Sequence, residues 1–364
     1  MRQALIDPDA IRSNVETVRR VVAPARVMAV VKADGYGHGA VISARAAVDA
    51  GADMIGVVDV DEALQLRAAG IAAPVLAWLH SASTDFTSAI AAHIDLGISS
   101  HTQLERAVVA GVPTIHVKVD SGLSRNGISL ADAPRVFEAA ALLERAGRLR
   151  VAGVFSHLAG GSAAIDDHQL RTFVEFLDVA SAAGLSPEYR HLAASRAAFD
   201  RPDLRFDMVR IGGALYGLSP DDGGDPGVRG LRPVMTLAST VVAVRRVDGG
   251  AGVSYSHAYH APRATTLALV PLGYADGLPR AASGRAEVAI RGVRYPVAGR
   301  IAMDQIVVDI GRDPVEVGDV AVAWGNPADG SPSVEEWAAW AGTISRELCT
   351  HVGSRVQRVS TVAR

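Results

Sequence analysis

The sequence predicts an α/β protein in which an N-terminal (β/α)8 barrel of the TIM type precedes a mostly β C-terminal domain. Its 364 residues exceed the size of one ordinary domain, so two domains are expected. Up to about residue 215, short β-branched apolar runs alternate with longer stretches rich in Ala, Leu and Arg. Beyond about residue 225, the helical stretches between the runs disappear. We therefore expect the barrel over residues 1–225 and the β domain over residues 226–364.

Eight apolar runs in the first part have the character of strands, and segments such as 38–50 and 60–70 between them have helical composition. Strands that alternate with helices indicate a parallel sheet, and eight such units favour a closed barrel. An open doubly wound sheet would instead predict a GxGxxG turn after the first strand, where this chain has Lys32. The predicted strands are 27–32, 54–58, 74–79, 95–100, 115–120, 151–157, 189–194 and 208–213.

The C-terminal part begins after SPDDGGDPGVRG (219–230), whose Gly, Pro and Asp content predicts a linker. One helix is expected over residues 333–345, with Ser333 as its N-cap. Short turns without helices separate the remaining strand-like runs, which indicates antiparallel β structure. These runs are 236–247, 265–273, 286–291, 293–298, 306–310 and 315–324.

Composition and charge exclude several classes of protein. The formal net charge of -3 leaves no basic surplus for nucleic acid or an anionic membrane surface. A single cysteine, Cys349, excludes a disulfide or a cysteine metal cluster within one chain, and the other candidate ligands lack metal-site spacing. We find no secretory signal and no apolar run near the roughly 20 residues of a membrane span. The expectation is a cytoplasmic protein without a metal, nucleic-acid or membrane partner.

Polar side chains gather where the predicted barrel strands end, which is where barrel enzymes place their active sites. Each one alone could simply mark the point at which a strand reaches water. Together they indicate a site, because polar groups that end apolar strands are costly unless they converge on a ligand. In chain order they are Lys32, Lys118, Asp120, Arg125, His157, Ser195, Arg210, Gly212 and Gly213.

Lys32 is the most informative of these residues, because it ends the nearly uncharged run VMAVVK. Burial lowers the pKa of a lysine, which suits Schiff-base formation with a carbonyl cofactor. Ser195 and the pair Gly212-Gly213 follow the last two strands, a common phosphate position in barrels, although double glycine is also ordinary turn chemistry. Tyr36, between glycines, can extend its hydroxyl to the same phosphate.

The segment AVVKADGYGHG (29–39) resembles the pyridoxal-phosphate attachment motif of the alanine racemase family, which consists of fold-type III enzymes. Five further segments resemble motifs of that family in the same order, so the resemblance covers almost the whole chain and implies a barrel followed by a β domain. They are IHVKVDSGLSRNG (115–127), FDMVRIGGALYG (206–217), GVSYSHAY (252–259), LVPLGYADGLPR (269–280) and GRIAMDQIVVDI (299–310).

The resemblance implies interconversion of L- and D-alanine with pyridoxal 5'-phosphate as cofactor, in the supply of D-alanine. Lys32 would bind the cofactor and act as one base, and Tyr255 would act as the other. Arg210 would face the pyridine nitrogen, and His157 would link Arg210 towards Tyr255. The residues implied to hold the phosphate are Tyr36, Ser195, Gly212 and Gly213.

The resemblance also implies a homodimer whose subunits share their active sites. Arg125 would bind the carboxylate of the amino-acid substrate, and Lys118, often carbamylated in this family, would orient Arg125. The partner subunit would supply Tyr255, Met303 and Asp304, and Tyr274 would help to line the entrance. Without the family context, the structural interpretation is favoured for each of three residues: His157 as a structural histidine, Tyr255 as a packed strand aromatic and Met303 as a core residue.

Four departures from the family pattern bear on specificity. Ala194 stands where Asn is usual, Ala302 stands where Cys is common, and SRE (345–347) replaces a segment that commonly carries Tyr. The fourth departure is GSRVQR (353–358), in which both Ser354 and Gln357 differ from the family pattern. Family members with Tyr at the position of Ser354 have less room for the substrate side chain. The changes predict relaxed specificity towards serine.

Three alternative functions stay open from the sequence. A fold-type III amino-acid decarboxylase usually carries a catalytic cysteine in its C-terminal domain, but Cys349 lies in a different context, ELCTHV. A single-barrel, non-catalytic cofactor carrier would lack the β domain. A diverged racemase-like protein would act on another substrate.

Overall fold

The computed structural model describes residues 1–221 and 224–361, so part of the predicted linker, residues 222–223, lies outside the description. The chain divides into two compact units. We call Val15–Gly35 and Ala44–Leu215 the barrel unit. The other segments, Met1–Asn14, Tyr36–Ser43 and Tyr216–Arg364, form the β unit. The boundary expected after residue 225 stays a prediction.

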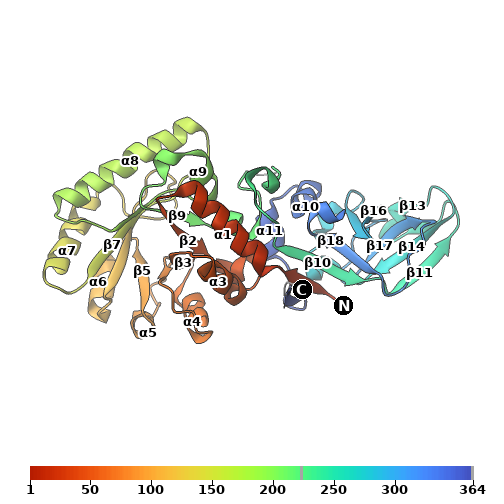
Figure 1. The fold of residues 1–364 in the computed structure, drawn as a ribbon, viewed down its shortest axis with the longest axis horizontal. Helices are drawn as coiled ribbons and strands as arrows, with labels where there is room; N and C mark the ends of the chain where they lie inside the picture. The colour runs from red at the N-terminus through yellow and green to blue at the C-terminus, as the bar shows by residue number, and fades with distance from the viewer. Residues whose placement is uncertain (222–223, 362–364) are drawn as a thin grey trace. The chain divides into compact units, whose positions relative to one another are not determined.

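The barrel unit contains the eight predicted parallel strands, in the order β8-β7-β6-β5-β4-β3-β2-β9. Figure 1 labels five of them, β2, β3, β5, β7 and β9. A parallel bridge between Ala194 and Arg210 joins the two ends of this order, and the amide of Arg210 donates to the carbonyl of Ala193 at 3.0 Å. The prediction of a (β/α)8 barrel is therefore confirmed. The strands are β2 (Arg26–Val30), β3 (Met54–Val57), β4 (Val75–Ala77), β5 (Ile94–Ile98), β6 (Thr114–Lys118), β7 (Arg150–Phe155), β8 (Tyr189–His191) and β9 (Met208–Ile211).

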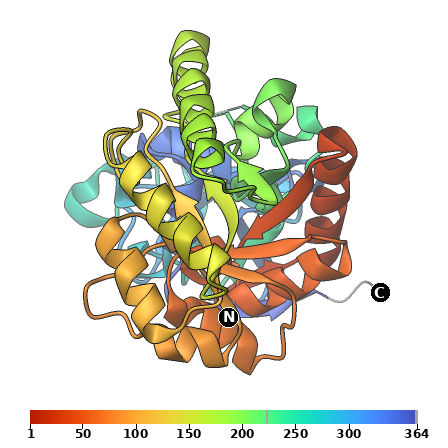
Figure 2. The same cartoon turned by 90° about the vertical axis from the view of Figure 1, so that its left-hand side faces the viewer.

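Helices lie outside the barrel strands, as Figure 2 shows end-on. Several begin at caps that the sequence supplies: Asp59 accepts the amide of Glu62, and Ser100 accepts the amide of Gln103. The helices in and next to the barrel are α1 (Pro8–Val22), α2 (Lys32–Tyr36), α3 (Ala40–Asp49), α4 (Val60–Ala68), α5 (Phe86–Ala91), α6 (His101–Ala110), α7 (Ala133–Arg145), α8 (Ala163–Ala182) and α9 (Ser195–Asp200), with short 3-10 turns η1 (Pro202–Leu204) and η2 (Gly213–Tyr216).

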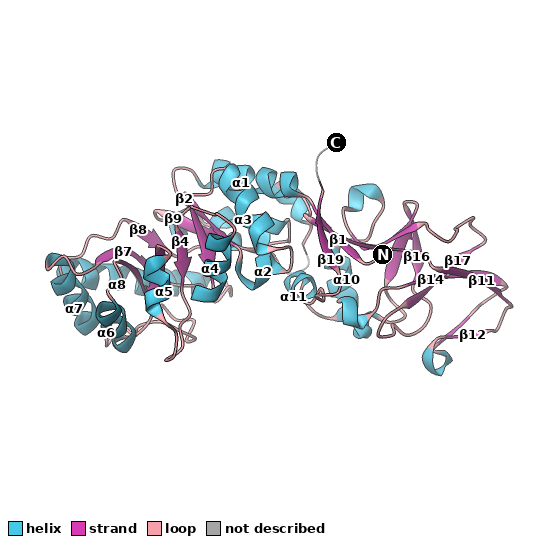
Figure 3. Cartoon of the chain, turned by 90° about the horizontal axis from the view of Figure 1, so that it is seen from below, coloured by secondary structure: helices cyan, strands magenta, loops and turns pink. Residues whose placement is uncertain are grey.

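The β unit is mostly β structure, as predicted, and Figure 3 shows its strands in magenta. A six-stranded sheet has the order β16-β15-β18-β10-β1-β19, a second sheet has the order β11-β14-β17, and β12 pairs with β13. The strands are β1 (Gln3–Ile6), β10 (Met235–Thr240), β11 (Ala243–Val247), β12 (Gly252–Val253), β13 (Tyr259–His260), β14 (Thr265–Val270), β15 (Glu287–Ile290), β16 (Val293–Pro296), β17 (Ile306–Gly311), β18 (Val320–Trp324) and β19 (Gln357–Ser360).

Two details of the β unit correct the sequence prediction. The helix expected over 333–345 is wrong in extent: α10 (Val334–Ala341) ends where Gly342 adopts a left-handed φ of 72°, and α11 (Ser345–Thr350) follows. Ser333 is the N-cap of α10, as predicted, and Glu336 completes a capping box with it. The run 236–247 is two strands in different sheets rather than one strand.

The described residues contain no helix that is long and apolar enough to cross a membrane. Within the same residues, no group of three or more His, Cys, Asp or Glu side chains is placed to hold a metal ion.

Candidate active site

Lys32 lies two residues after the end of β2 and opens a strained turn. Ala33, Asp34 and Gly35 have φ values of 53°, 50° and 63°, in the left-handed region that costs about 1–2 kcal/mol for each non-glycine residue. The carboxylate of Glu62 accepts the amide of Ala33 at 2.7 Å with one oxygen and the amide of Val58 at 2.8 Å with the other. Glu62 thus ties the end of β2 to the end of β3 and stabilises the backbone beside the Lys32 amine.

Four cationic side chains influence one another at this end of the barrel. The pKa of Lys32 is lowered by burial and then by Arg125 and Arg210, against the opposing effect of Glu62. The pKa of Lys118 is lowered to about 8 by burial first and then by Arg210, Arg125 and Lys32. Such a cluster of like charges favours an anionic ligand. It therefore fits the phosphate and carboxylate groups of a cofactor and a substrate.

Arg210 is 6% exposed, yet no carboxylate in the described part of the chain pairs with it. Nη1 donates to the carbonyl of His191 at 2.7 Å, and Nη2 donates to the carbonyls of Ser156 and Leu192 at 2.6 and 3.1 Å. Burial lowers the pKa of Arg210 to about 10, so the guanidinium keeps its proton at neutral pH. Its positive charge remains available to a ligand.

His157 lies two residues after the end of β7, and its Nδ1 is 3.2 Å from Nη2 of Arg210. A guanidinium can only donate, so Nδ1 accepts and the neutral ring carries its hydrogen on Nε2. Burial, followed by the charges of Arg210 and Arg125, lowers the pKa of His157 to about 3. His157 is therefore a neutral hydrogen-bond donor at working pH.

The loop after β6 presents Arg125 and is closed at its base. The amide of Asp120 donates to the carbonyl of Ile128 at 2.9 Å, and the amide of Ile128 donates to the carbonyl of Lys118 at 2.9 Å. Gly127 has a φ of 139°, and a side chain there would lie 2.5 Å from the Asp120 amide. The closed loop holds the exposed Arg125 near Lys118.

Ser195 and the glycine pair also come together in the barrel unit. Ser195 opens α9, and its Oγ accepts the amide of Ala214 at 3.4 Å. Gly212 and Gly213 are buried immediately before Ala214, and Gly213 opens η2. The helix start, the hydroxyl and the glycine backbone offer neutral donors for a phosphate.

The remaining predicted site residues lie in the β unit. Tyr36 is partly buried, which raises the pKa of its phenol, and its ring centroid is 5.1 Å from that of Tyr216. Tyr274 donates its amide to the carbonyl of Ala302 at 3.0 Å. The structure thereby brings Tyr274 beside the Met303-Asp304 pair.

Tyr255 is 69% exposed on a strained turn. Its neighbours Ser254 and Ser256 have φ values of 61° and 59°, a conformation that is costly for residues other than glycine. Ser254 Oγ donates to the carbonyl of Arg300 at 2.8 Å, which ties this turn to the segment that leads to Met303. Tyr255 is therefore held on the surface of the β unit.

Several residues around the site were not predicted from the sequence. Glu62 positions the backbone next to Lys32, and His191 positions Arg210. Gln169 donates to the carbonyl of His157 at 3.3 Å. Arg355 pairs with Asp304 at 2.7 Å and with the buried Asp276. Most of the predicted barrel residues of the site end strands, whereas Glu62 and Gln169 lie on helices and His191 lies within a predicted strand. A buried histidine inside the apolar run 189–194 was the available signal.

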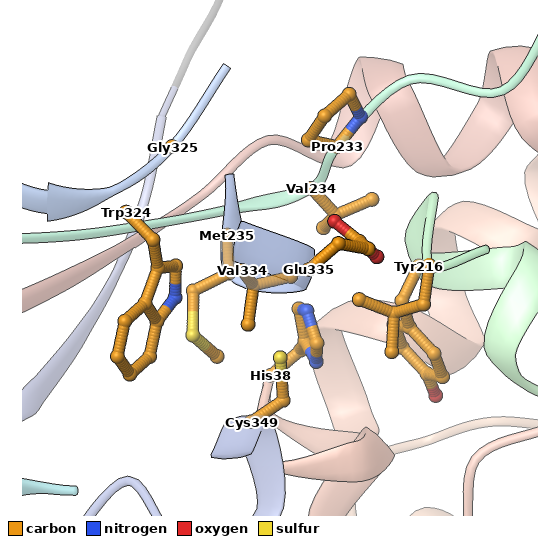
Figure 4. A pocket seen from close by; sticks show the side chains of 11 residues that line it. His38, Tyr216, Pro233, Val234, Met235, Trp324, Gly325, Val334, Glu335 and Cys349 are labelled. Carbon is orange, nitrogen blue, oxygen red and sulfur yellow. The ribbon is translucent and has the colours of Figure 1, made fainter. Parts of the chain in front are cut away.

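A cavity in the β unit offers no alternative site for a phosphate group. Trp324, Met235, His38, Glu335 and Cys349 surround it (Figure 4). Its lining has a carboxylate but no Lys or Arg. Burial, reinforced by Glu335, raises the pKa of the Cys349 thiol, so this cysteine is poorly suited to act as a nucleophile.

Comparison with known proteins agrees with this geometry. Residues 6–220 match the model of the alanine racemase N-terminal domain, and residues 234–360 match that of the C-terminal domain. Alanine racemases of Thermobifida fusca and Salinispora tropica are 50% and 49% identical to the chain, covering 99% and 97% of it and 98% and 96% of the relatives.

Solved structures give the same result. The alanine racemase of the D-cycloserine producer Streptomyces lavendulae superposes with a TM-score of 0.96 at 43% identity, over 100% of this chain and 97% of that one. That of Streptomyces coelicolor gives 0.95 at 46% identity, over 100% and 98%. The family models and the full-length relatives agree: the chain belongs to the alanine racemase family.

Proposed function

We propose that the protein is a pyridoxal 5'-phosphate-dependent isomerase that interconverts L- and D-alanine with Lys32 and Tyr255 as its two bases. The observation that carries the proposal is the cluster of Lys32, Lys118, Arg125 and Arg210, in which burial and neighbouring cations lower the pKa of Lys32. A lysine with a lowered pKa is more often neutral, and only the neutral amine can attack an aldehyde or accept a proton.

The donor set fits this cofactor. Ser195, Gly212, Gly213 and Tyr36 would hold its phosphate, and Lys32 would hold its aldehyde carbon. When bound, the cofactor withdraws electrons from the α-carbon of the substrate and so makes the α-proton acidic. Arg210 would face the ring nitrogen, and Arg125 would bind the carboxylate of the substrate.

The two bases would act on opposite faces of the α-carbon. The Lys32 amine would remove or return the proton on one face, and the phenol of Tyr255 would do so on the other. A free tyrosine has a pKa near 10, so its phenolate needs a hydrogen-bond donor. The Nε2–H of His157, with Arg210 behind it, could supply that donor without a full positive charge on the imidazole.

A homodimer would bring these groups together. Tyr255, Tyr274 and Met303 are 69%, 43% and 53% exposed, so their side chains are accessible to a second subunit. In our proposal, Tyr255, Met303 and Asp304 serve the site of the second subunit. A cytoplasmic location stays a prediction.

Incubation of the purified, cofactor-loaded protein with L-alanine tests the proposal. We expect a visible absorbance band from the imine between the cofactor and Lys32, which in Lys32→Ala should shift to the shorter wavelength of the free aldehyde, together with progressive loss of the chirality of L-alanine. Release of carbon dioxide would indicate the decarboxylase instead. An absorbance band without turnover of L-alanine would indicate a carrier or a racemase for another substrate.

A further inference from the structure

A column of polar side chains leads from Arg210 into the barrel interior. Nη1 of Arg210 lies 3.2 Å from Nδ1 of His191, and Nε2 of His191 lies 3.0 Å from Nδ1 of His116. His116 and His191 are both fully buried. The two imidazoles connect β6 and β8 inside the barrel and end at the guanidinium on β9.

The donors and acceptors in this column can be assigned in only one way while both imidazoles are neutral. Because the guanidinium only donates, Nδ1 of His191 must accept, and its hydrogen must be on Nε2. That hydrogen then points at Nδ1 of His116, which must accept in turn. The remaining hydrogen lies on Nε2 of His116, which has no hydrogen-bond partner among the described residues.

Burial keeps both rings in the neutral form that this pattern requires. Burial is the largest cause of the low pKa of His116, which is about 3. Burial is also the largest cause that lowers the pKa of His191 well below its ordinary value. A proton added to His191 would place an N–H against the N–H of Arg210. Protonation of His116 at Nδ1 would likewise oppose the N–H of His191.

Ring packing holds the two imidazoles in these orientations. The His191 ring stacks on Phe155 with a centroid distance of 4.7 Å and an interplanar angle of 7°. The His116 ring lies parallel to Tyr189 at 5.9 Å and meets His191 edge-on at 5.2 Å. Gly153 completes the fit, because a side chain there would overlap Nδ1 of His116.

We propose that His191 and His116 are positioning residues that lock the donor geometry of Arg210 through a one-way chain of imidazole hydrogen bonds. Both partners are neutral acceptors, so the chain orients the guanidinium without neutralising its charge as a carboxylate would. The catalytic part of this inference rests on the proposed function, in which Arg210 faces the cofactor ring. The tautomer pattern itself does not depend on that function.

The tautomers can be measured directly by nitrogen NMR on the full-length apo protein labelled with 15N-histidine. We expect His191 and His116 each to carry hydrogen on Nε2 only. His116→Leu leaves the Nε2–H of His191 without an acceptor, so its nitrogen and proton signals should lose the shift of a hydrogen-bonded group while the hydrogen stays on Nε2. His116→Asn keeps an acceptor near the Nδ1 position and should retain the wild-type pattern of His191.

Kinetics of the cofactor-loaded protein supply the second measurement. His116→Leu should lower kcat about fivefold to tenfold, the effect of one misplaced hydrogen bond, with little change in KM, whereas His116→Asn should stay within about twofold of wild type. Wild-type rings protonated on Nδ1, or equal damage in both variants, would overturn the inference. The nitrogen NMR spectrum of the wild type tests the tautomer assignment even if His116→Leu does not fold. Absence of racemisation by the wild type, with the tautomers as expected, would overturn the proposed function alone.

Discussion

The Nη2 atom of Arg210 lies 3.2 Å from Nδ1 of His157, a contact in which the guanidinium must donate. Burial lowers the pKa of Arg210 only to about 10, so it does not yield its proton at neutral pH. A pyridine nitrogen that faces Arg210 would therefore stay unprotonated, and the ring would be a weaker electron sink than a protonated one. The residue beside that nitrogen should then influence the choice of reaction.

Arg210→Glu tests this consequence. A carboxylic acid can share a proton with the ring nitrogen, which strengthens electron withdrawal and favours side reactions. We expect the ratio of transamination to racemisation to rise about tenfold or more, equivalent to about 1.4 kcal/mol in relative barrier height. Product analysis of pyruvate against D-alanine gives the ratio, and Arg210→Lys controls for loss of the guanidinium shape. An unchanged ratio in Arg210→Glu would contradict the account.

Lys118 should form a carbamate. Burial and the neighbouring cations lower its pKa to about 8, so the neutral amine becomes abundant as the pH rises through that value. The amine nitrogen then bonds to the carbon of carbon dioxide, releases a proton to solvent and leaves an anion beside Arg125 and Arg210. With 13C-bicarbonate, we expect a carbamate signal in the carbon NMR spectrum that grows from pH 7 to pH 9. Lys118→Ala should lack it, and an identical signal in that variant would assign the carbamate elsewhere.

Stability should fall in acid because the barrel histidines are buried as neutral rings. The pKa values of His116 and His157 drop from an ordinary value of 6.5 to about 3 on folding. Between these values the unfolded chain binds more protons than the folded chain, so the free energy of unfolding decreases as the pH falls from 6.5 towards 3. Denaturant unfolding across this range should give a shallower pH slope for His116→Asn than for wild type.

His168→Asn, at an exposed position on α8, controls for the substitution itself. A slope for His116→Asn equal to that of wild type would mean that His116 does not contribute to the acid sensitivity.

The sequence departures predict measurable activity on serine. Ser354 stands where a tyrosine of the family crowds the substrate side chain, so a slightly larger substrate gains space. Steady-state assays on alanine and serine under equal conditions measure the preference. Ser354→Tyr should reduce the kcat/KM for serine relative to that for alanine by about tenfold or more, the discrimination expected from a pocket narrowed by one group. A wild-type rate on serine several orders of magnitude below that on alanine would reject this expectation.

The barrel could be predicted from the sequence because its strands are buried on both faces and appear as continuous apolar runs. β1 and β19 were not predicted: β1 precedes the barrel in the sequence but pairs with β10 and β19 of the C-terminal sheet, and β19 carries polar residues at both ends. The site could be predicted where polar residues end strands, as with Lys32, Lys118 and His157. Glu62 and His191 could not, because their roles depend on which backbone amide or guanidinium lies beside them in three dimensions.

Exchange of the α-hydrogen of alanine for deuterium tests the two-base account most directly. We would follow L- and D-alanine separately with wild type, Lys32→Ala and Tyr255→Phe, each loaded with cofactor. The account predicts that wild type exchanges both enantiomers with inversion. Tyr255→Phe should exchange one enantiomer without inversion, because the Lys32 amine still serves its own face, and Lys32→Ala should lose exchange of that same enantiomer. Racemisation by Tyr255→Phe at the wild-type rate would contradict the account. So would loss of exchange of the same enantiomer in both Tyr255→Phe and Lys32→Ala.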